Sequence, residues 1–189
     1  HRAAGQAIVT LSLKKTGVPP GDATAEQMDG IAALAERYSA GEIRVSHEQN
    51  LVLPHVARRD LPALWQGARA RGLATPHIGL LTDLVCCPGG DFCSLANARS
   101  IPVADAIQQR FDDLDYLFDL GPLELNLSGC VNACGHHHIG HIGILGVDKN
   151  NEEWYQITLG GREGNNSSIG KVIGPSFAAR DVPDVIEKI

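Results

Sequence analysis

The stretch "LNLSGCVNACGHHHIGHIGILG", residues 125–146, decides how the second half of the chain is interpreted. It begins as an apolar strand, turns at two cysteines separated by three residues, and then holds four histidines within six positions. Thiolate and imidazole ligands favour different metals, so the cysteines and the histidines indicate different sites. We therefore consider the two groups separately.

A second pair of cysteines completes a set of four thiols. Cys87 and Cys93 are separated by "PGGDF" and follow the apolar segment 78–85, which we expect to be a strand. Each pair therefore follows a strand and lies in a glycine-containing turn, which predicts two loops at the same end of a sheet. Four thiolates suit an iron–sulfur cluster or a tetrahedral zinc ion. The five-residue gap favours the cluster, and ordinary buried thiols are the third interpretation.

Disulfide bonds do not explain the cysteines well. The chain has five of them, and none lies in the first 85 residues. An odd, clustered set in an acidic chain is a poor disulfide framework, so metal binding is favoured. Cys86 is interpreted as a small buried hydrophobe on the strand; the alternative is that it replaces Cys87 as a ligand.

Composition limits the classes of function. The 189 residues are 43% hydrophobic, enough for a real core, and the net charge is −6. An acidic chain is a poor partner for nucleic acid or an anionic membrane. No apolar run approaches the about 20 residues of a membrane helix, and we expect a cytoplasmic protein. The chain stops inside a predicted helix that Asp181 caps, so we expect a piece of a longer protein.

The first part, residues 1–75, is predicted to have the order β-α-β-β-α of a ferredoxin-like half unit. The expected elements are a strand at 7–14, a helix from the capping box Thr24–Gln27 to Gly41, two strands in 42–56 around a turn at 48–50, and a helix from Asp60 to Gly72. The apolar stripes of the two helices are predicted to be Met28, Ile31, Ala35 and Tyr38, and Leu61, Leu64, Trp65 and Ala68. The pairs Lys14–Lys15 and Arg58–Arg59 are interpreted as solvated surface charge.

The second part, residues 76–189, is predicted to be a mixed α/β domain, so the fold class is α+β. We expect a helix opened by Pro102 with Leu114 still in its register, strands at 123–129, 141–147 and 153–161, and a loop at 161–174. His137 and His141 are spaced to chelate a metal on a helix, but "HIGHIGILG" is typical of a loop entering a strand. A separate metal site at His136, His137, His138 and His141 is therefore not favoured.

The pairing of "CPGGDFC" (87–93) with "LSGCVNACG" (127–135), preceded by "GEIRVSHEQNLVL" (41–53), resembles the sulfite and nitrite reductase hemoproteins. The stretch "SGCVNACGHHHIGHIGILGVDK" (128–149) resembles the bacterial assimilatory sulfite reductases of that family in particular. The resemblance covers essentially the whole chain and corresponds to the second, C-terminal half of such a protein. It implies a [4Fe–4S] cluster coupled to siroheme and the six-electron reduction of sulfite, or of nitrite in the related enzymes.

The resemblance also implies roles for particular residues. Cys87, Cys93, Cys130 and Cys134 would hold the cluster, and Cys134 would also bind the siroheme iron. Asn132 would lie near the cofactor or simply form the turn between the cysteines, and Arg44 and Gln49 match a strand near the cofactor or simply stabilise a hairpin. The anion-binding Arg and Lys residues are expected in the missing N-terminal half. We therefore expect the isolated chain to lack siroheme and activity, and the donor to be a flavoprotein reductase or ferredoxin.

Overall fold

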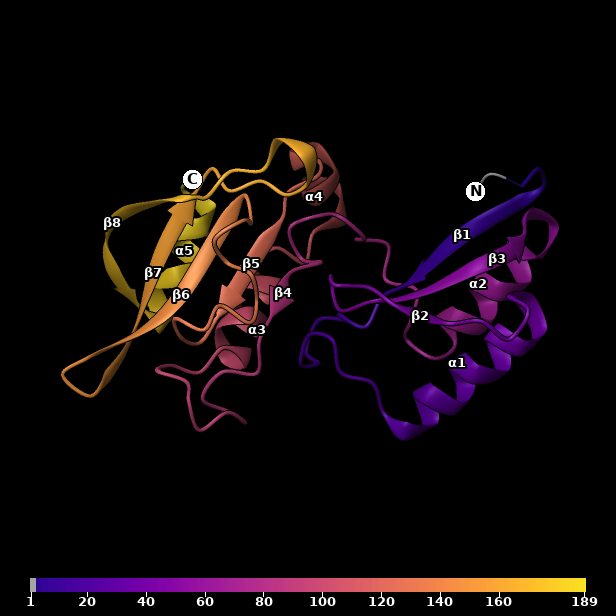
Figure 1. Ribbon diagram of the computed structural model, residues 1–189, viewed down its shortest axis with the longest axis horizontal. Coiled ribbons are helices and arrows are strands. Elements are labelled where there is room, and N and C mark those ends of the chain that lie inside the picture. Colours follow the sequence, from indigo (N-terminus) through magenta and orange to yellow (C-terminus); the bar gives the residue numbers. More distant parts are fainter. Residues whose placement is uncertain (1–2) are drawn as a thin grey trace. The chain divides into compact units, whose positions relative to one another are not determined.

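The computed structural model describes residues 3–189 and divides the chain into two units (Figure 1). One unit contains the residues up to Lys15 together with Gly21–Ile78, and the other contains Thr16–Pro20 together with Gly79–Ile189. Each unit has its own hydrophobic core and is described by itself. Within residues 3–189, none of the helices combines the length and the apolar character that crossing a membrane requires.

The first unit is a three-stranded antiparallel sheet with two helices. The sheet has the order β1-β3-β2, and its core lies between these strands and the helices. The predicted β-α-β-β-α order is confirmed. Its elements are β1 (Gln6–Leu11), α1 (Ala25–Tyr38), β2 (Arg44–Val45), β3 (Leu51–Ala57), a 3-10 turn η1 (Arg58–Asp60) and α2 (Leu61–Arg69).

Local signals in the sequence set the boundaries of these elements. The Thr24 hydroxyl accepts a hydrogen bond from the Gln27 backbone at 3.1 Å, and the Gln27 side chain accepts one from the Thr24 backbone at 3.0 Å. This reciprocal pair satisfies two amides that the first turn of α1 would leave without partners. Gln49, with φ of 59°, makes the predicted turn between β2 and β3.

The helical core faces differ in part from the predicted stripes. Ile31 and Ala35 are buried as predicted, but Met28 is 61% exposed and Trp65 is 51% exposed. Leu34 is buried instead, because Gly67 leaves room for it; a Cβ on Gly67 would lie 2.8 Å from the Leu34 side chain. Because the two helices approach closely at this glycine, the face of α1 that contains Leu34 is buried, and Met28 of the predicted stripe is not.

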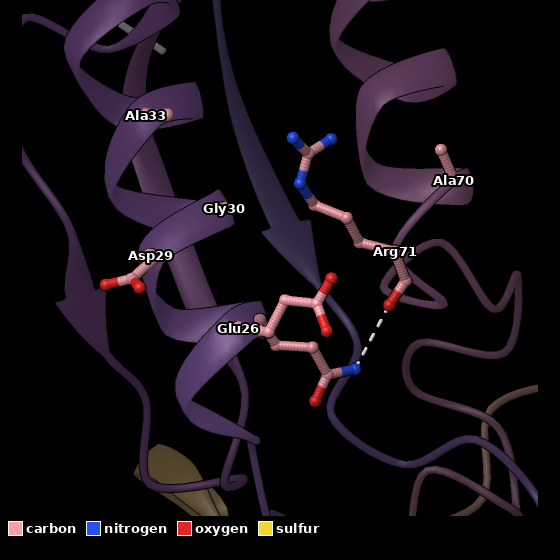
Figure 2. Close-up of a pocket in the computed structure, with 7 residues that line it drawn as sticks. Glu26, Asp29, Gly30, Ala33, Ala70 and Arg71 are labelled. Atoms are coloured by element: carbon pink, nitrogen blue, oxygen red, sulfur yellow. Dashed lines mark hydrogen bonds between the residues drawn. The ribbon is translucent and has the colours of Figure 1, made fainter.

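Arg71 lies in the surface hollow between α1 and α2 (Figure 2). Its guanidinium stem occupies the space that a Cβ on Gly30 would need, and its Nη1 donates to the Gly67 carbonyl at 2.9 Å. The Gln27 side chain donates to the Arg71 carbonyl at 3.0 Å, which is the bond drawn in Figure 2. These contacts account for the hollow as part of the helix–helix packing.

One surface prediction in this unit is wrong. Lys14 was expected on the solvated surface with Lys15, but Lys14 is fully buried and only Lys15 is exposed. The backbone after β1 turns inward here, where the Ser12 hydroxyl accepts from the Lys14 backbone and lies 2.8 Å from His77 Nε2. Arg58 and Arg59 are exposed as predicted.

The second unit is built on a five-stranded mixed sheet of order β4-β5-β6-β7-β8. β4, β5 and β6 are parallel, and β6, β7 and β8 are antiparallel. The mixed α/β class is confirmed. The elements are β4 (Val85–Cys86), α3 (Ile101–Arg110), α4 (Leu114–Leu120), β5 (Leu125–Ser128), β6 (Ile142–Lys149), β7 (Glu152–Leu159), a 3-10 turn η2 (Gly164–Asn166), β8 (Lys171–Ala178), a 3-10 turn η3 (Ala179–Asp181) and α5 (Val182–Glu187).

Three element predictions in this unit are wrong. The strand expected at 78–85 is almost entirely turns, because Asp83 accepts from the Gly79 backbone and folds the chain back before β4. The loop expected at 161–174 ends in β8, which pairs with β7. The helix opened by Pro102 ends at Arg110, and a separate helix, α4, begins after Asp113, whose carboxylate caps it.

Candidate metal centre

The two cysteine loops leave neighbouring parallel strands at the same edge of the sheet. β4 and β5 pair with Cys86 opposite Leu127, so Cys87 follows one strand and Cys130 lies two residues beyond the other. Cys86 itself belongs to the hydrophobic core, as expected for a buried thiol on the strand. The sheet therefore fixes where both loops begin.

We call residues 87–100, between β4 and α3, the cysteine arch. It folds back on itself, with the Gly90 backbone donating to the Ala98 carbonyl at 2.9 Å and the Cys93 backbone donating to the Gly89 carbonyl at 2.9 Å. Ala98, 1% exposed, packs against the sheet. A Cβ on Gly129 or on Gly146 would lie 2.7 Å from Ala98 atoms, so both glycines let the arch pack closely.

The other loop is the cysteine turn, residues 129–135. The Ala133 backbone donates to the Cys130 carbonyl at 3.1 Å, and the Gly135 backbone donates to the Ser128 hydroxyl at 3.0 Å. Asn132 is exposed in this turn, and Ala133 has a φ of 56°. The turn therefore presents Cys134 at the surface, whereas Cys130 stays buried.

The two loops meet at a sulfur atom. The Gly129 backbone N–H donates to Cys87 Sγ at 3.1 Å, and the Gly129 carbonyl accepts from the backbones of Asn97 and Ala98. Cys87 is buried and Cys93 is half-buried. Within residues 3–189, no three or more Cys, His, Asp or Glu side chains gather at metal-binding distance, so the four thiols are not assembled around one point.

The residues nevertheless fit an iron–sulfur cluster. Thiolates are the ligands of such clusters, and backbone N–H groups aimed at sulfur stabilise the negative charge of the thiolate. The Gly129–Cys87 hydrogen bond is a contact of this kind. The donor set is therefore that of a thiolate-bound cluster on two loops.

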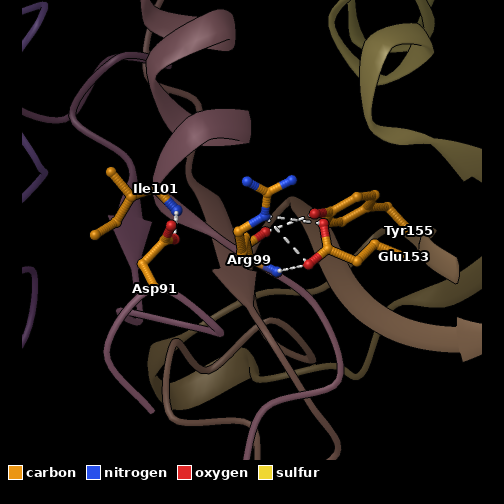
Figure 3. Close-up of polar contacts among 5 residues, drawn as sticks. All are labelled: Asp91, Arg99, Ile101, Glu153 and Tyr155. Atoms are coloured by element: carbon orange, nitrogen blue, oxygen red, sulfur yellow. Dashed lines mark hydrogen bonds and ion pairs between the residues drawn. The ribbon is translucent and has the colours of Figure 1, made fainter. Parts of the chain in front are cut away.

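The end of the arch is fastened to β7 (Figure 3). Glu153 accepts from the backbone and the Nε of Arg99 at 3.2 to 3.3 Å, and the Tyr155 hydroxyl donates to the Arg99 carbonyl at 2.6 Å. The hydrogen bond to Glu153 raises the pKa of Arg99, and burial raises the pKa of Tyr155, so both remain protonated donors. We call these contacts of Arg99 with Glu153 and Tyr155 the clasp. No local sequence pattern predicts them, because the partners are more than 50 residues apart.

The remaining predicted site residues lie in different settings. Arg44 is exposed and donates to Glu42 at 2.6 Å; this hydrogen bond is the main cause of the lowered pKa of Glu42. Gln49 is part of the β2–β3 turn and packs against Gly21. Both belong to the first unit, whereas all five cysteines belong to the second.

The four histidines of residues 136–141 lie in turns and a bend before β6, not on a helix, as predicted. His141 Nδ1 accepts from the Glu124 backbone at 3.0 Å, which places its ring proton on Nε2. His137 is 1% exposed, its Nδ1 has no hydrogen-bond partner among the described residues, and its ring lies 3.9 Å from that of His138. Burial, with a smaller effect of His138, lowers the pKa of His137 to about 4. His137 is therefore neutral near pH 7.

Fold and site together define a class: a protein with a ferredoxin-like half unit followed by a mixed α/β domain that carries four thiols on two loops. Residues 15–71 match the family described as nitrite/sulfite reductase ferredoxin-like half domain, and residues 80–189 match the nitrite and sulphite reductase 4Fe-4S domain. The chain belongs to the sulfite and nitrite reductase family. The cofactors of this family are a [4Fe–4S] cluster and siroheme.

Individual relatives agree with this assignment. The chain is 31% identical to a ferredoxin–nitrite reductase of Synechococcus elongatus over 91% of its length, and 29% identical to sulfite reductase [ferredoxin] 2 of Mycolicibacterium paratuberculosis over 94%. Among solved structures, the NirA protein of Mycobacterium tuberculosis superposes with a TM-score of 0.75, at 26% identity and over 95% of this chain. In each comparison the chain spans 34% of the relative's length.

Proposed function

We propose that this chain is the cofactor-carrying portion of a reductase that converts sulfite to sulfide by adding six electrons. The observation that carries the proposal is the arrangement of the cysteine arch and the cysteine turn on neighbouring parallel strands, joined by the hydrogen bond from Gly129 to Cys87. Two thiols from each loop give the four ligands of a [4Fe–4S] cluster.

Cys87, Cys93, Cys130 and Cys134 are the proposed cluster ligands. Cys134, exposed on the cysteine turn, is also the proposed thiolate ligand of the siroheme iron. The bound cofactors would supply the electrons and the metal on which the oxyanion is reduced. Gly129 stabilises the charge on Cys87, and the clasp at Arg99 keeps the arch in place beside the turn.

Three polar residues are proposed to contact the siroheme. Asn132 lies between two ligand cysteines and is exposed, so its amide is accessible to a cofactor carboxylate. Arg44 and Gln49 are proposed for the same role on the first unit. Arg44 is exposed and forms an ion pair with Glu42.

Nitrite is the second candidate substrate, because relatives with similar identity are named for either substrate. Ferredoxin is the proposed electron donor, since the names of both relatives include it, and a flavoprotein reductase is the alternative. We place the protein in the cytoplasm. We further propose that the oxyanion-binding groups lie outside this chain, which spans about a third of the length of its curated relatives, and that the chain alone does not turn over sulfite.

The test of the substrate uses the longer protein that contains this chain, with a chemically reduced dye as electron donor. Consumption of sulfite with a higher kcat/KM than nitrite supports the proposal, and the opposite order assigns nitrite reduction. The ligand assignment is tested by Cys87→Ala and Cys86→Ala. The first should lose the cluster iron and the second should retain it; the reverse would make Cys86 the ligand.

A further inference from the structure

Ser100 is at the N-cap of α3 but does not cap this helix. A serine in this position usually accepts a hydrogen bond from a backbone N–H of the first turn. The Ser100 side chain makes no such bond. Instead, Asp91 of the cysteine arch accepts from the Ile101 backbone at 3.2 Å, as Figure 3 shows. Asp91, and not Ser100, therefore caps the first turn of α3.

The Ser100 hydroxyl is directed at a cysteine sulfur. Its Oγ lies 3.6 Å from Cys87 Sγ, and the residue is fully buried. A Cβ on Gly129 would lie 3.0 Å from this oxygen, and a Cβ on Gly89 would collide with it. The hydroxyl is therefore enclosed between two glycines, with Cys87 Sγ as its hydrogen-bond partner among the described residues.

The direction of this hydrogen bond follows from the chemistry of the sulfur. In the free thiol either atom can donate, but a cysteine that binds a metal is a thiolate without a proton. The hydroxyl must then be the donor. Cys87 Sγ would accept from two groups, the Ser100 hydroxyl and the Gly129 backbone N–H.

The clasp on β7 holds Ser100 where it can donate. Arg99, the preceding residue, is fixed through its backbone N–H and its carbonyl by Glu153 and Tyr155. The following residue, Ile101, is fixed by Asp91. Ser100 is therefore held in place by hydrogen bonds to the residues on both sides of it.

We propose that Ser100 is a positioning residue that tunes the reduction potential of the cluster through Cys87. Hydrogen bonds to cluster sulfur stabilise the reduced form, which carries more negative charge, and so raise the potential. The inference rests on the proposed function, since it takes Cys87 to be a cluster ligand. It adds a residue that the cysteine pattern does not include.

The experiment compares the chain with its Ser100→Ala and Ser94→Ala variants after anaerobic reconstitution with ferrous iron and sulfide. Ser94 is an exposed serine of the same arch and serves as the matched control. Iron and acid-labile sulfide are measured first, and the midpoint potential is then determined by a titration followed by electron paramagnetic resonance. Tyr155→Phe, which frees the Arg99 carbonyl but leaves Ser100 intact, is the second variant.

The proposal predicts that Ser100→Ala keeps the iron and sulfide of the unchanged chain but takes up an electron about tenfold less readily. For a one-electron couple this is a shift of about 59 mV to more negative potential. Tyr155→Phe should shift the same way by less, and Ser94→Ala should not shift. An unchanged potential in Ser100→Ala would overturn the tuning role, as would loss of iron from that variant, because Ser100 would then be purely structural. Absence of iron and sulfide from the unchanged chain would overturn the cluster assignment itself, and the metal analysis identifies that case.

Discussion

At the scale of single residues, the two cysteine loops can pack together at Gly129 because this residue has no side chain. Its N–H reaches Cys87, its carbonyl receives two N–H groups of the arch, and a Cβ would lie 2.7 Å from both the Ala98 carbonyl and Gly89. Backbone atoms on two sides cannot rotate away as a side chain can. The loops must therefore separate if this position is filled.

Gly129→Ala is expected to destabilise the second unit by about 1 to 3 kcal/mol, the usual range for overpacking. Urea unfolding measures the change. Gly90→Ala is the matched control: a Cβ there would lie no closer than 3.3 Å to any neighbour, so the loss should be below about 0.5 kcal/mol. Equal losses at the two positions would show that the loops are not tightly joined at Gly129.

His137 gives the second unit a dependence on acid. Its pKa is about 4 in the folded chain and 6.5 in the reference state, so the unfolded chain binds a proton that the folded chain resists. The stability contributed is complete above pH 6.5 and is lost as the pH falls toward 4, by at most about 3 kcal/mol. In His137→Phe the unfolding free energy should change much less across this window, while His138→Phe, at the exposed neighbour, should keep most of the dependence. A wild-type slope in His137→Phe would contradict the assignment.

At the scale of elements, β7 holds the cysteine arch through the clasp at Arg99. Tyr155→Phe keeps the ring in the core but leaves the Arg99 carbonyl without the hydroxyl at 2.6 Å. An unsatisfied group of this kind costs about 1 to 3 kcal/mol. Protection of the arch amides from hydrogen exchange should fall, while that of β1 and β3 in the other unit should stay the same. Unchanged protection in the arch would mean that β7 does not hold it.

The elements also show which parts of the fold could be predicted from the sequence. The first unit was predictable in order because its signals are local: a capping box at Thr24 and a turn at Gln49 that need only near neighbours. β8 was not predictable, because Gly174 and Pro175 interrupt its apolar residues and it becomes a strand through pairing with β7. Trp65 and Met28 were misplaced because the close crossing at Gly67 sets which helix face is buried.

The candidate site likewise has residues that could be predicted from the sequence and residues that could not. The four cysteines and their glycine turns are visible as a local pattern in the sequence. Ser100 is not, because it occupies a position where serine usually caps a helix, and its sulfur partner is 13 residues away. The Glu153 and Tyr155 contacts depend on how β7 is placed in the sheet, which no local pattern specifies.

At the scale of the whole molecule, the cysteine arch and the cysteine turn both belong to the second unit. The chain spans about a third of the length of the curated relatives that it matches. Its second unit supplies two loops for a cluster, but within residues 3–189 the four thiols are not gathered around one point. A cluster would join the arch and the turn through four bonds, so binding should stabilise the second unit in particular. The cofactor would thus complete the packing between two loops that the sheet only brings to the same edge.

The most direct test of this account is a metal and sulfide analysis of the purified chain, with its visible absorption spectrum, after anaerobic reconstitution. We predict about four iron and four acid-labile sulfide per chain and a broad brown absorption, all lost in Cys130→Ser. A colourless protein with one zinc per chain and no sulfide would contradict the account and make the four cysteines a structural zinc site.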